Sequence, residues 1–331
     1  MSSIDDHRSL LLSNTSAWDR LLGRMVMVWI SRAREVGRCM AAFRSPLAVA
    51  ARMARNGPWP YSVELHDGRH VILESSRDAW MFAHSFGSPE FRLTRLSTGS
   101  DKVTQFEFEG GEPERRVLIW LPPGVGDPGI FLSGEYGYLE PRGRTVVDIG
   151  AGAGESAIYF VLRGAARVLA YEPMPVTFEY AEQNIRANGL ELQIRLHREA
   201  VGARVGEVGV GRELTTATVR ALSAETGNIR TAITTLTKIV ETEHLEDACL
   251  KVDCEGDEYG LLLTTPPAIL RHFRFIVVEY HFGSDSLLNH LMKAGFRVRA
   301  SRPNYSPKSP HPGVYYGLIS ATREVSADAS D

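Results

Sequence analysis

Apolar and polar positions follow a repeating rhythm over the second half of this 331-residue chain, from about residue 144 onward. Short, continuous apolar runs alternate there with longer segments whose apolar positions recur every three or four residues. Continuous apolar runs are typical of strands buried in a parallel sheet, and the other segments are typical of the helices that cover it. The rhythm therefore predicts an α/β fold with a doubly wound, mostly parallel, Rossmann-like sheet. The seven predicted strands are "TVVDI", "RVLAYE", "LQIRL", "ACLKVD", "FRFIVVEY", "FRVRA" and "VYYGLISA".

The helices between these strands have recognisable ends. The segment "PVTFEYAEQNIRANG" begins with Pro175, a residue favoured in the first helical turn, and Gly189 follows its last helical position. Further helices are predicted in "ESAIYFVLRGA" and over residues 259–263 and 287–293. Sheets of this kind bind ligands beyond the carboxyl ends of their strands, so we expect the functional residues there.

The first part of the chain follows a different pattern. Residues 1–60 are basic with helical periodicity, and the breaker cluster "NGPWP" closes them. The next region holds two alternating runs around Asp67 and Gly68, which predict a tight hairpin, and a helix near residues 79–86. The predicted organisation is an N-terminal helical segment over 1–60, a small β-rich region over 61–133, a main domain over 134–322 and a frayed tail over 323–331.

Composition and charge limit the compartment and the binding partners that we expect for the protein. The most apolar early stretch, "LLGRMVMVWI" from Leu21, is too short and too often interrupted by arginine to span a bilayer. Its spacing favours a helix packed on the protein itself over one resting on a membrane or a partner. A formal net charge of -3 gives no general attraction for nucleic acid. Three scattered cysteines indicate a reducing compartment, so we expect a cytoplasmic protein, and a homo-oligomer stays open.

The stretch "VVDIGAGAGESAIYF", which begins at Val146, places a glycine-rich turn after the first strand of the predicted sheet. Such a turn serves two classes of cofactor. The dinucleotide pattern G-x-G-x-x-G fails, because Glu155 or Ala157 stands where the third glycine belongs. A carboxylate at Glu155 would also repel a pyrophosphate. A Walker-type phosphate loop is absent, since no Gly-Lys-Ser/Thr follows.

A cofactor with positive charge in place of phosphate fits this turn. S-adenosylmethionine carries an amine and a sulfonium, and Asp148 at the strand end accepts from such donors. Glu172 ends the second strand, about where an acid binds ribose hydroxyls in α/β nucleotide sites. The pattern D-x-G-x-G-x-G with a later "YEP" favours a class I methyltransferase over another Rossmann-like domain with a capping acid. The predicted cofactor-binding residues are Asp148, Gly150, Gly152, Gly154, Glu172, Glu135 and Ala200.

Four quoted stretches give the chain a family resemblance. They are "VVDIGAGAGESAIYFVLRGAARVLAYEP", "NIRANGL", "LKVDCEGDEYGLL" and "VVEYH", and they resemble the FkbM family of S-adenosylmethionine-dependent methyltransferases from about residue 134 to 321. The most family-specific motif is K-x-D-x-E-G-x-E, which covers Lys251, Asp253, Glu255, Gly256 and Glu258. Cys254 stands where an aliphatic residue is more usual. The resemblance implies O-methylation of a hydroxyl on a sugar, a polyketide or a similar small molecule.

The chemistry of methyl transfer to a hydroxyl points to residues at two strand ends. The reaction needs two aligned partners and a group that takes the proton. The catalytic candidates are Asp253, Glu255, Glu279 and His281, which follow "ACLKV" and "FRFIVV". Asp253 is the first choice for contact with the acceptor or the cofactor, and its alternative role is to cap the next helix. His281, with an unperturbed pKa of about 6.5, suits a general base at neutral pH, and a purely structural role is its alternative.

Two further groups have open interpretations. Asp253, Glu255 and Glu258 could surround a divalent metal. A solvated helix start has the same composition and is the interpretation we favour, so no metal is assigned. The segment "SGEYGYLEP" places Glu135 and Tyr136 before the first strand, where they could cover the cofactor or only pack against the sheet.

The leading functional hypothesis is methylation of a small-molecule hydroxyl acceptor. An RNA methyltransferase that docks through the arginine-rich N-terminal region is the second, although the sequence has no recognisable RNA-binding module. A non-catalytic protein that binds S-adenosylmethionine or acts as a scaffold is the third. A dehydrogenase is the fourth, and Glu155 argues against it.

Overall fold

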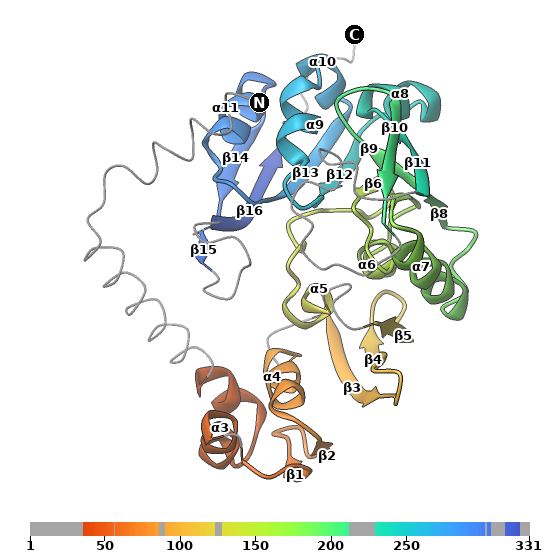
Figure 1. Ribbon diagram of the computed structural model, residues 1–331. Coiled ribbons are helices and arrows are strands. Elements are labelled where there is room, and N and C mark those ends of the chain that lie inside the picture. The colour runs from red at the N-terminus through yellow and green to blue at the C-terminus, as the bar shows by residue number, and fades with distance from the viewer. Residues whose placement is uncertain are drawn as a thin grey trace. The chain divides into compact units, whose positions relative to one another are not determined.

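The computed structural model describes residues 36–55, 57–85, 90–122, 128–211, 229–301, 303–305 and 315–324. The chain divides into two compact units, Met1–Leu93 and Thr94–Asp331 (Figure 1). The predicted helix around residues 21–30 and the predicted tail after residue 324 lie outside the described residues. The predicted domain boundaries stay predictions. Among the described residues, no helix is long and apolar enough to cross a membrane.

The first unit contains the predicted hairpin. Its elements are α3 (Pro46–Arg55), β1 (Tyr61–Glu64), β2 (His70–Leu73) and α4 (Ser76–Ser85). β1 and β2 pair antiparallel, with Tyr61 opposite Leu73. The turn between them uses a left-handed Gly68, with φ of 86°, and the Asp67 carboxylate accepts from the backbone N–H of Arg69. A flexible glycine and a side chain that bonds its own backbone are what such a turn requires, so the hairpin prediction is confirmed.

The second unit is built on the sheet that the apolar rhythm predicted. Its strand order is β14-β16-β13-β12-β6-β7-β8, with β15 paired to β16 off this path. The strands from β13 to β8 are mutually parallel, and β16 runs antiparallel to both of its neighbours, β13 and β14. The α/β fold and the mostly parallel sheet are confirmed. The bounds are β6 (Thr145–Ile149), β7 (Arg167–Tyr171), β8 (Ile194–His197), β12 (Ala248–Val252), β13 (Phe273–Tyr280), β14 (Arg297–Ala300), β15 (Asn304–Tyr305) and β16 (Tyr315–Thr322).

Helices pack on both faces of this sheet. Along β6, Val147 and Ile149 join one buried core with residues of α8, α9 and α11, such as Leu236. Asp148 lies between them and points to the opposite face, where it meets Ser156 of α6. This alternation is the two-residue period of a strand. The helices are α5 (Gly129–Ser133), α6 (Glu155–Leu162), α7 (Pro175–Ala187), α8 (Leu236–Glu243), α9 (Glu258–Thr264), α10 (Pro267–Leu270) and α11 (Asp285–Lys293) (Figure 1).

Two smaller sheets accompany the main one. β9 (Glu199–Val201), β10 (Gly206–Val210) and β11 (Ile229–Thr234) form a sheet in the order β10-β11-β9. β3 (Phe91–Thr98), β4 (Thr104–Gly110) and β5 (Arg115–Leu121) form another, in the order β3-β4-β5, and the second unit begins within β3 at Thr94. A chain of aromatic contacts ties β4 to the main domain, because Phe108 stacks on Phe131 of α5, which meets the ring of Tyr159 on α6 edge-on.

Candidate active site

The glycine loop between β6 and α6 is held against the end of β12. Gly150, Gly152 and Gly154 all have positive φ, at 75°, 57° and 84°. A Cβ added at Gly150 would collide with the carbonyl oxygen of Asp253, and one at Gly154 would lie 3.2 Å from Cα of Ala181 on α7. The loop therefore needs glycine for backbone conformation and for close packing at the same time.

Asp148, near the end of β6, holds this loop in place through contacts with neighbouring elements. Its side chain is completely buried, Oδ2 accepts a hydrogen bond from Ser156 Oγ at 2.6 Å, and Oδ1 lies 3.2 Å from Lys251 Nζ. Both interactions fix the end of β6 to neighbouring elements, α6 and β12. Contact of Asp148 with a cofactor stays a prediction, and the contacts present in this structure give it a role in holding the loop.

Lys251 is a buried cation that joins the two strand ends. Its side chain is 2% exposed, and Nζ donates to the carbonyl oxygen of Gly150 at 2.5 Å and lies 3.9 Å from Oδ2 of Asp253. Burial alone lowers the pKa of this ammonium, but the charges of Asp148 and Asp253 outweigh it and raise the pKa. The charged lysine therefore clamps the glycine loop to the acids after β12.

Glu172 and Glu155 bring two carboxylates to Gly152. Glu172, which follows β7, is buried and accepts from the backbone N–H groups of Gly152 at 3.1 Å and Met174 at 2.8 Å. Burial raises the pKa of Glu172 to about 8, against the lowering effect of these two hydrogen bonds, and the charge of Glu155 adds to the rise. Glu155 is the first residue of α6, and its Oε1 would lie 3.0 Å from a Cβ built at Gly152. Two carboxyl groups thus flank the middle of the loop.

Acidic groups also gather around Tyr136. Its hydroxyl donates to Oδ2 of Asp253 at 3.0 Å and lies 3.5 Å from Oε2 of Glu279. Burial, followed by the charges of Asp253 and Glu135, raises the pKa of Glu279 well above its usual range. Burial and the same acids also raise the pKa of Tyr136, which keeps its proton. The structure thus places Glu135, predicted as a cofactor ligand, near the catalytic candidates Asp253 and Glu279.

His281 lies between two carboxylates. Its Nδ1 is 3.0 Å from Oε1 of Glu258, which is fully buried, and its Nε2 is 3.5 Å from Oε2 of Glu255. Burial lowers the pKa of His281, but the hydrogen bond and charge of Glu258, with the charges of Asp253 and Glu255, outweigh it and raise the pKa to about 10. A raised pKa favours the doubly protonated imidazole at neutral pH, which argues against a general base, and the catalytic role of His281 stays a prediction.

The structure also bears on the expectations for Asp253, Glu258 and Ala200. The helix after the motif, α9, has Asp257 at its N-cap, so Asp253 does not cap it. Glu258 is not part of a solvated helix start, because its carboxylate is fully buried and accepts from the backbone N–H groups of Gly256 and His281. Ala200 is buried in β9, where it pairs with Ile233 of β11, and its contact with a cofactor stays a prediction.

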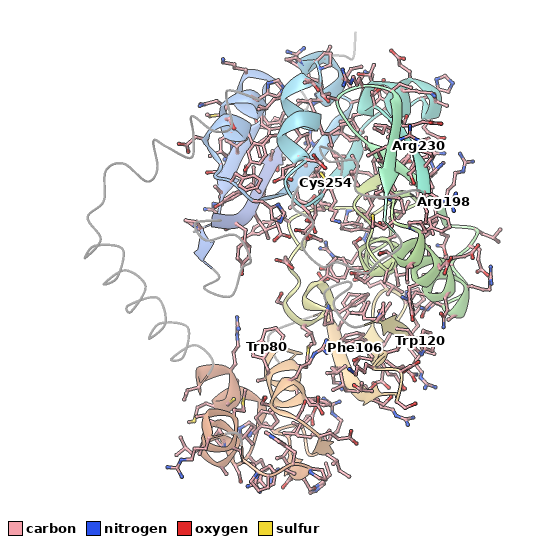
Figure 2. The ribbon with its side chains drawn as sticks, viewed as in Figure 1. Trp80, Phe106, Trp120, Arg198, Arg230 and Cys254 are labelled. Atoms are coloured by element: carbon pink, nitrogen blue, oxygen red, sulfur yellow. The ribbon has the colours of Figure 1, made fainter. Side chains whose placement is uncertain are left out.

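Sequence reasoning missed the function of two asparagines in "NIRANGL". Asn184 of α7 is fully buried, and its amide donates to the carbonyl oxygens of Ala153 in the glycine loop and Trp120 of β5, while it accepts from the Trp120 N–H. Asn188 bonds both backbone groups of Leu118 in the same way. Figure 2 labels Trp120 on this strand. The available signal was a pair of polar residues four positions apart on the buried face of an amphipathic helix.

The sequence of this chain is similar to sequences of known methyltransferases. Residues 148–298 match the model of the methyltransferase FkbM domain. A ribosomal protein L11 methyltransferase of Bacillus cereus is 28% identical over 140 residues, which cover 39% of this chain and 42% of that protein. The corresponding protein of Bacillus cytotoxicus is 30% identical over 139 residues, with the same coverage. The chain thus spans less than half the length of these curated relatives.

The crystal structure of a precorrin-6y C5,15-methyltransferase from Geobacter metallireducens covers 62% of this chain with 94% of its own length, at 13% identity and a TM-score of 0.39. The match to the family model confirms the resemblance that the motifs predicted. Residues 148–298 are therefore similar to methyltransferase FkbM domains.

Proposed function

We propose that the chain is an S-adenosylmethionine-dependent methyltransferase that methylates a hydroxyl group of a small molecule or a sugar. The observation that carries the proposal is the pair of carboxyl groups at Gly152, one accepting from its N–H and one 3.0 Å from where a Cβ would lie, within the region that matches the FkbM domain. A carboxylate at either position attracts a cationic cofactor and repels a diphosphate, and Glu172 does so once it has given up its proton. It therefore supports S-adenosylmethionine over a dinucleotide.

S-adenosylmethionine supplies a methyl group already activated on a positively charged sulfur. The chain would hold it through the glycine loop and through Glu172, which would accept hydrogen bonds from the ribose hydroxyls. Lys251 keeps the loop in place through the carbonyl oxygen of Gly150. Direct contacts of Asp148, Glu135 and Ala200 with the cofactor belong to this proposal.

The acceptor would lie on the side of Asp253 and Glu279. In the transfer, the acceptor oxygen forms a bond to the methyl carbon as the carbon–sulfur bond breaks, and the hydroxyl proton must leave to a base. Glu279 is the candidate for this base. Asp253 already accepts the Tyr136 proton at 3.0 Å, and both ring nitrogens of His281 face carboxylates, whereas the phenol lies 3.5 Å from Glu279.

The test is transfer of a labelled methyl group from S-adenosylmethionine into a cell extract that has been separated into small-molecule, RNA and protein fractions. We expect label in the small-molecule fraction, in a form that resists mild alkali as a methyl ether does. Glu279→Gln should abolish transfer and leave binding of S-adenosylhomocysteine intact, while Glu182→Gln on the exposed face of α7 should change neither. Label in the RNA or protein fraction would overturn the acceptor class, and transfer by Glu279→Gln at the wild-type rate would overturn the role of Glu279.

A further inference from the structure

Three side chains at the carboxyl ends of two adjacent strands bring metal-binding atoms together. Asp253 follows β12, Glu255 lies two residues further on, and His281 follows β13. One donor atom from each lies within 4.8 Å of the others. Metal ligands at ~2.1–2.2 Å from a cation stand about 3 to 4.4 Å apart. The Glu255 side chain is half exposed, so a small movement of this one group closes the set around an ion.

The imidazole of His281 is oriented by a residue outside this set. Nδ1 bonds to the fully buried carboxylate of Glu258, which also accepts from the backbone N–H of His281 and is thereby fixed. Nε2 is left facing Glu255. Metal-binding histidines usually donate the other ring N–H to a carboxylate in this way, which fixes the tautomer and makes the metal-facing nitrogen more basic.

Carboxyl groups next to this set outnumber the donors that they share. Glu279 is partly buried next to the set, and the hydroxyl of Tyr136, at 3.5 Å from it, has one proton that bonds to Asp253 at the shorter distance of 3.0 Å. The Lys251 ammonium is 3.9 Å from Asp253 but 2.5 Å from the Gly150 carbonyl oxygen and 3.2 Å from Asp148. A lysine committed to the glycine loop leaves the outer side of Asp253 open to another cation.

We propose that Asp253, Glu255 and His281 bind one divalent transition-metal ion, with Glu258 as the residue that orients His281. Two carboxylate oxygens and one imidazole nitrogen suit Mn²⁺ or Zn²⁺ better than Ca²⁺ or Mg²⁺, which prefer oxygen ligands throughout. Water or ligand atoms complete the coordination. The metal site does not require that the chain transfer methyl groups, and it is tested without cofactor or acceptor.

The experiment is a titration of the untagged chain with MnCl₂ at about pH 8, where the metal ion must displace the second proton of His281 in order to bind. Free Mn²⁺ is followed by electron paramagnetic resonance, and ZnCl₂ and MgCl₂ are added as competitors. We expect one saturable Mn²⁺ site, displaced by Zn²⁺ and poorly by Mg²⁺. Loss of one ligand in Glu255→Gln or Asp253→Asn should weaken binding by ~10-fold or more.

Glu182→Gln is the matched control, because Glu182 is a similarly exposed acid on α7 and should leave Mn²⁺ affinity unchanged. Glu255 is exposed enough that its replacement should not unfold the domain, which the wild-type thermal midpoint of the variant would confirm. Absence of saturable binding to the wild-type chain would overturn the proposal, as would equal affinities of the wild type and Glu255→Gln. Binding of S-adenosylhomocysteine, measured in parallel, separates failure of the metal site from failure of the proposed function.

Discussion

The two halves of the candidate site lie at the same edge of one sheet. They differ in how far hydrogen-bond donors and cations of the chain compensate their acids. At the ends of β6 and β7, Asp148 and Glu172 are buried, and each has two donors or cations from the chain itself. At the ends of β12 and β13, Glu255 and Glu279 crowd together with Asp253, and the pKa of each of these two glutamates is raised by burial and by the charge of Asp253.

The acids after β6 and β7 therefore form a structural framework, and the acids after β12 and β13 form the reactive half of the site. Buried acids held by hydrogen bonds and by the Lys251 ammonium keep the glycine loop in one conformation, which is what a cofactor site requires. Crowded, partly exposed acids are unfavourable in isolation and become favourable when a cation or a hydroxyl donor arrives. Lys251 connects the halves, since its ammonium contacts the glycine loop and lies near Asp253.

Loss of the Lys251 contacts, which join the two halves, should have the largest effect. Lys251→Met leaves the buried charge of Asp148 without its cation, so the free energy of unfolding should fall by about 3–5 kcal/mol. The double variant with Asp148→Asn should recover part of this loss, because both buried charges are then gone. Urea denaturation measures both effects, with Lys238→Met on the exposed face of α8 as the control. A Lys251→Met variant as stable as that control would contradict the stabilising role of Lys251.

The glycine loop offers a test with a built-in control. Gly150→Ala puts a Cβ into the carbonyl oxygen of Asp253 at a positive φ, so we expect a loss of about 2–4 kcal/mol in unfolding free energy and a large loss of S-adenosylhomocysteine affinity. Gly143 has a similar φ of 72° but open space around it. Gly143→Ala should therefore cost only about 1 kcal/mol and leave binding unchanged. Equal effects of the two substitutions would mean that close packing at Gly150 is unimportant.

The smallest expected effect concerns pH. The ligand-free pKa of Glu172 is about 8, so below that pH the carboxyl holds a proton. Ribose hydroxyls bond best to the ionised form, and binding must then release the proton. Affinity for S-adenosylhomocysteine should therefore rise by up to ~10-fold per unit as pH increases toward about 8 and then level off. Glu172→Gln should show a flatter profile in calorimetry over the same range, and identical slopes would contradict the assignment.

Much of the framework was predictable from sequence, because it follows from periodic patterns and local rules. The strands of the main sheet, the Pro175 start of α7 and the hairpin at Gly68 each depend on residues close together in the chain. The electrostatic argument about the glycine loop also rested on Glu155 and Glu172, and both lie at Gly152 in the structure.

The reactive half was less predictable, because its properties come from residues far apart in the chain. The general-base expectation for His281 used the pKa of an isolated imidazole, whereas Glu258 and Glu255 from another strand end raise that pKa to about 10. The contact of Tyr136 with Asp253 joins residues 117 positions apart. No periodicity encodes either contact.

The most direct test of the account is calorimetric titration of the chain with S-adenosylhomocysteine and, separately, with NAD⁺. Above about pH 8, where Glu172 is ionised, the carboxylates at Gly152 should favour the ligand without phosphate by at least ~100-fold, or about 2.7 kcal/mol. Glu172→Ala should weaken binding of S-adenosylhomocysteine. Binding of NAD⁺ as tightly as S-adenosylhomocysteine, or wild-type affinity in Glu172→Ala, would contradict the central claim that acids at the glycine loop select the cofactor.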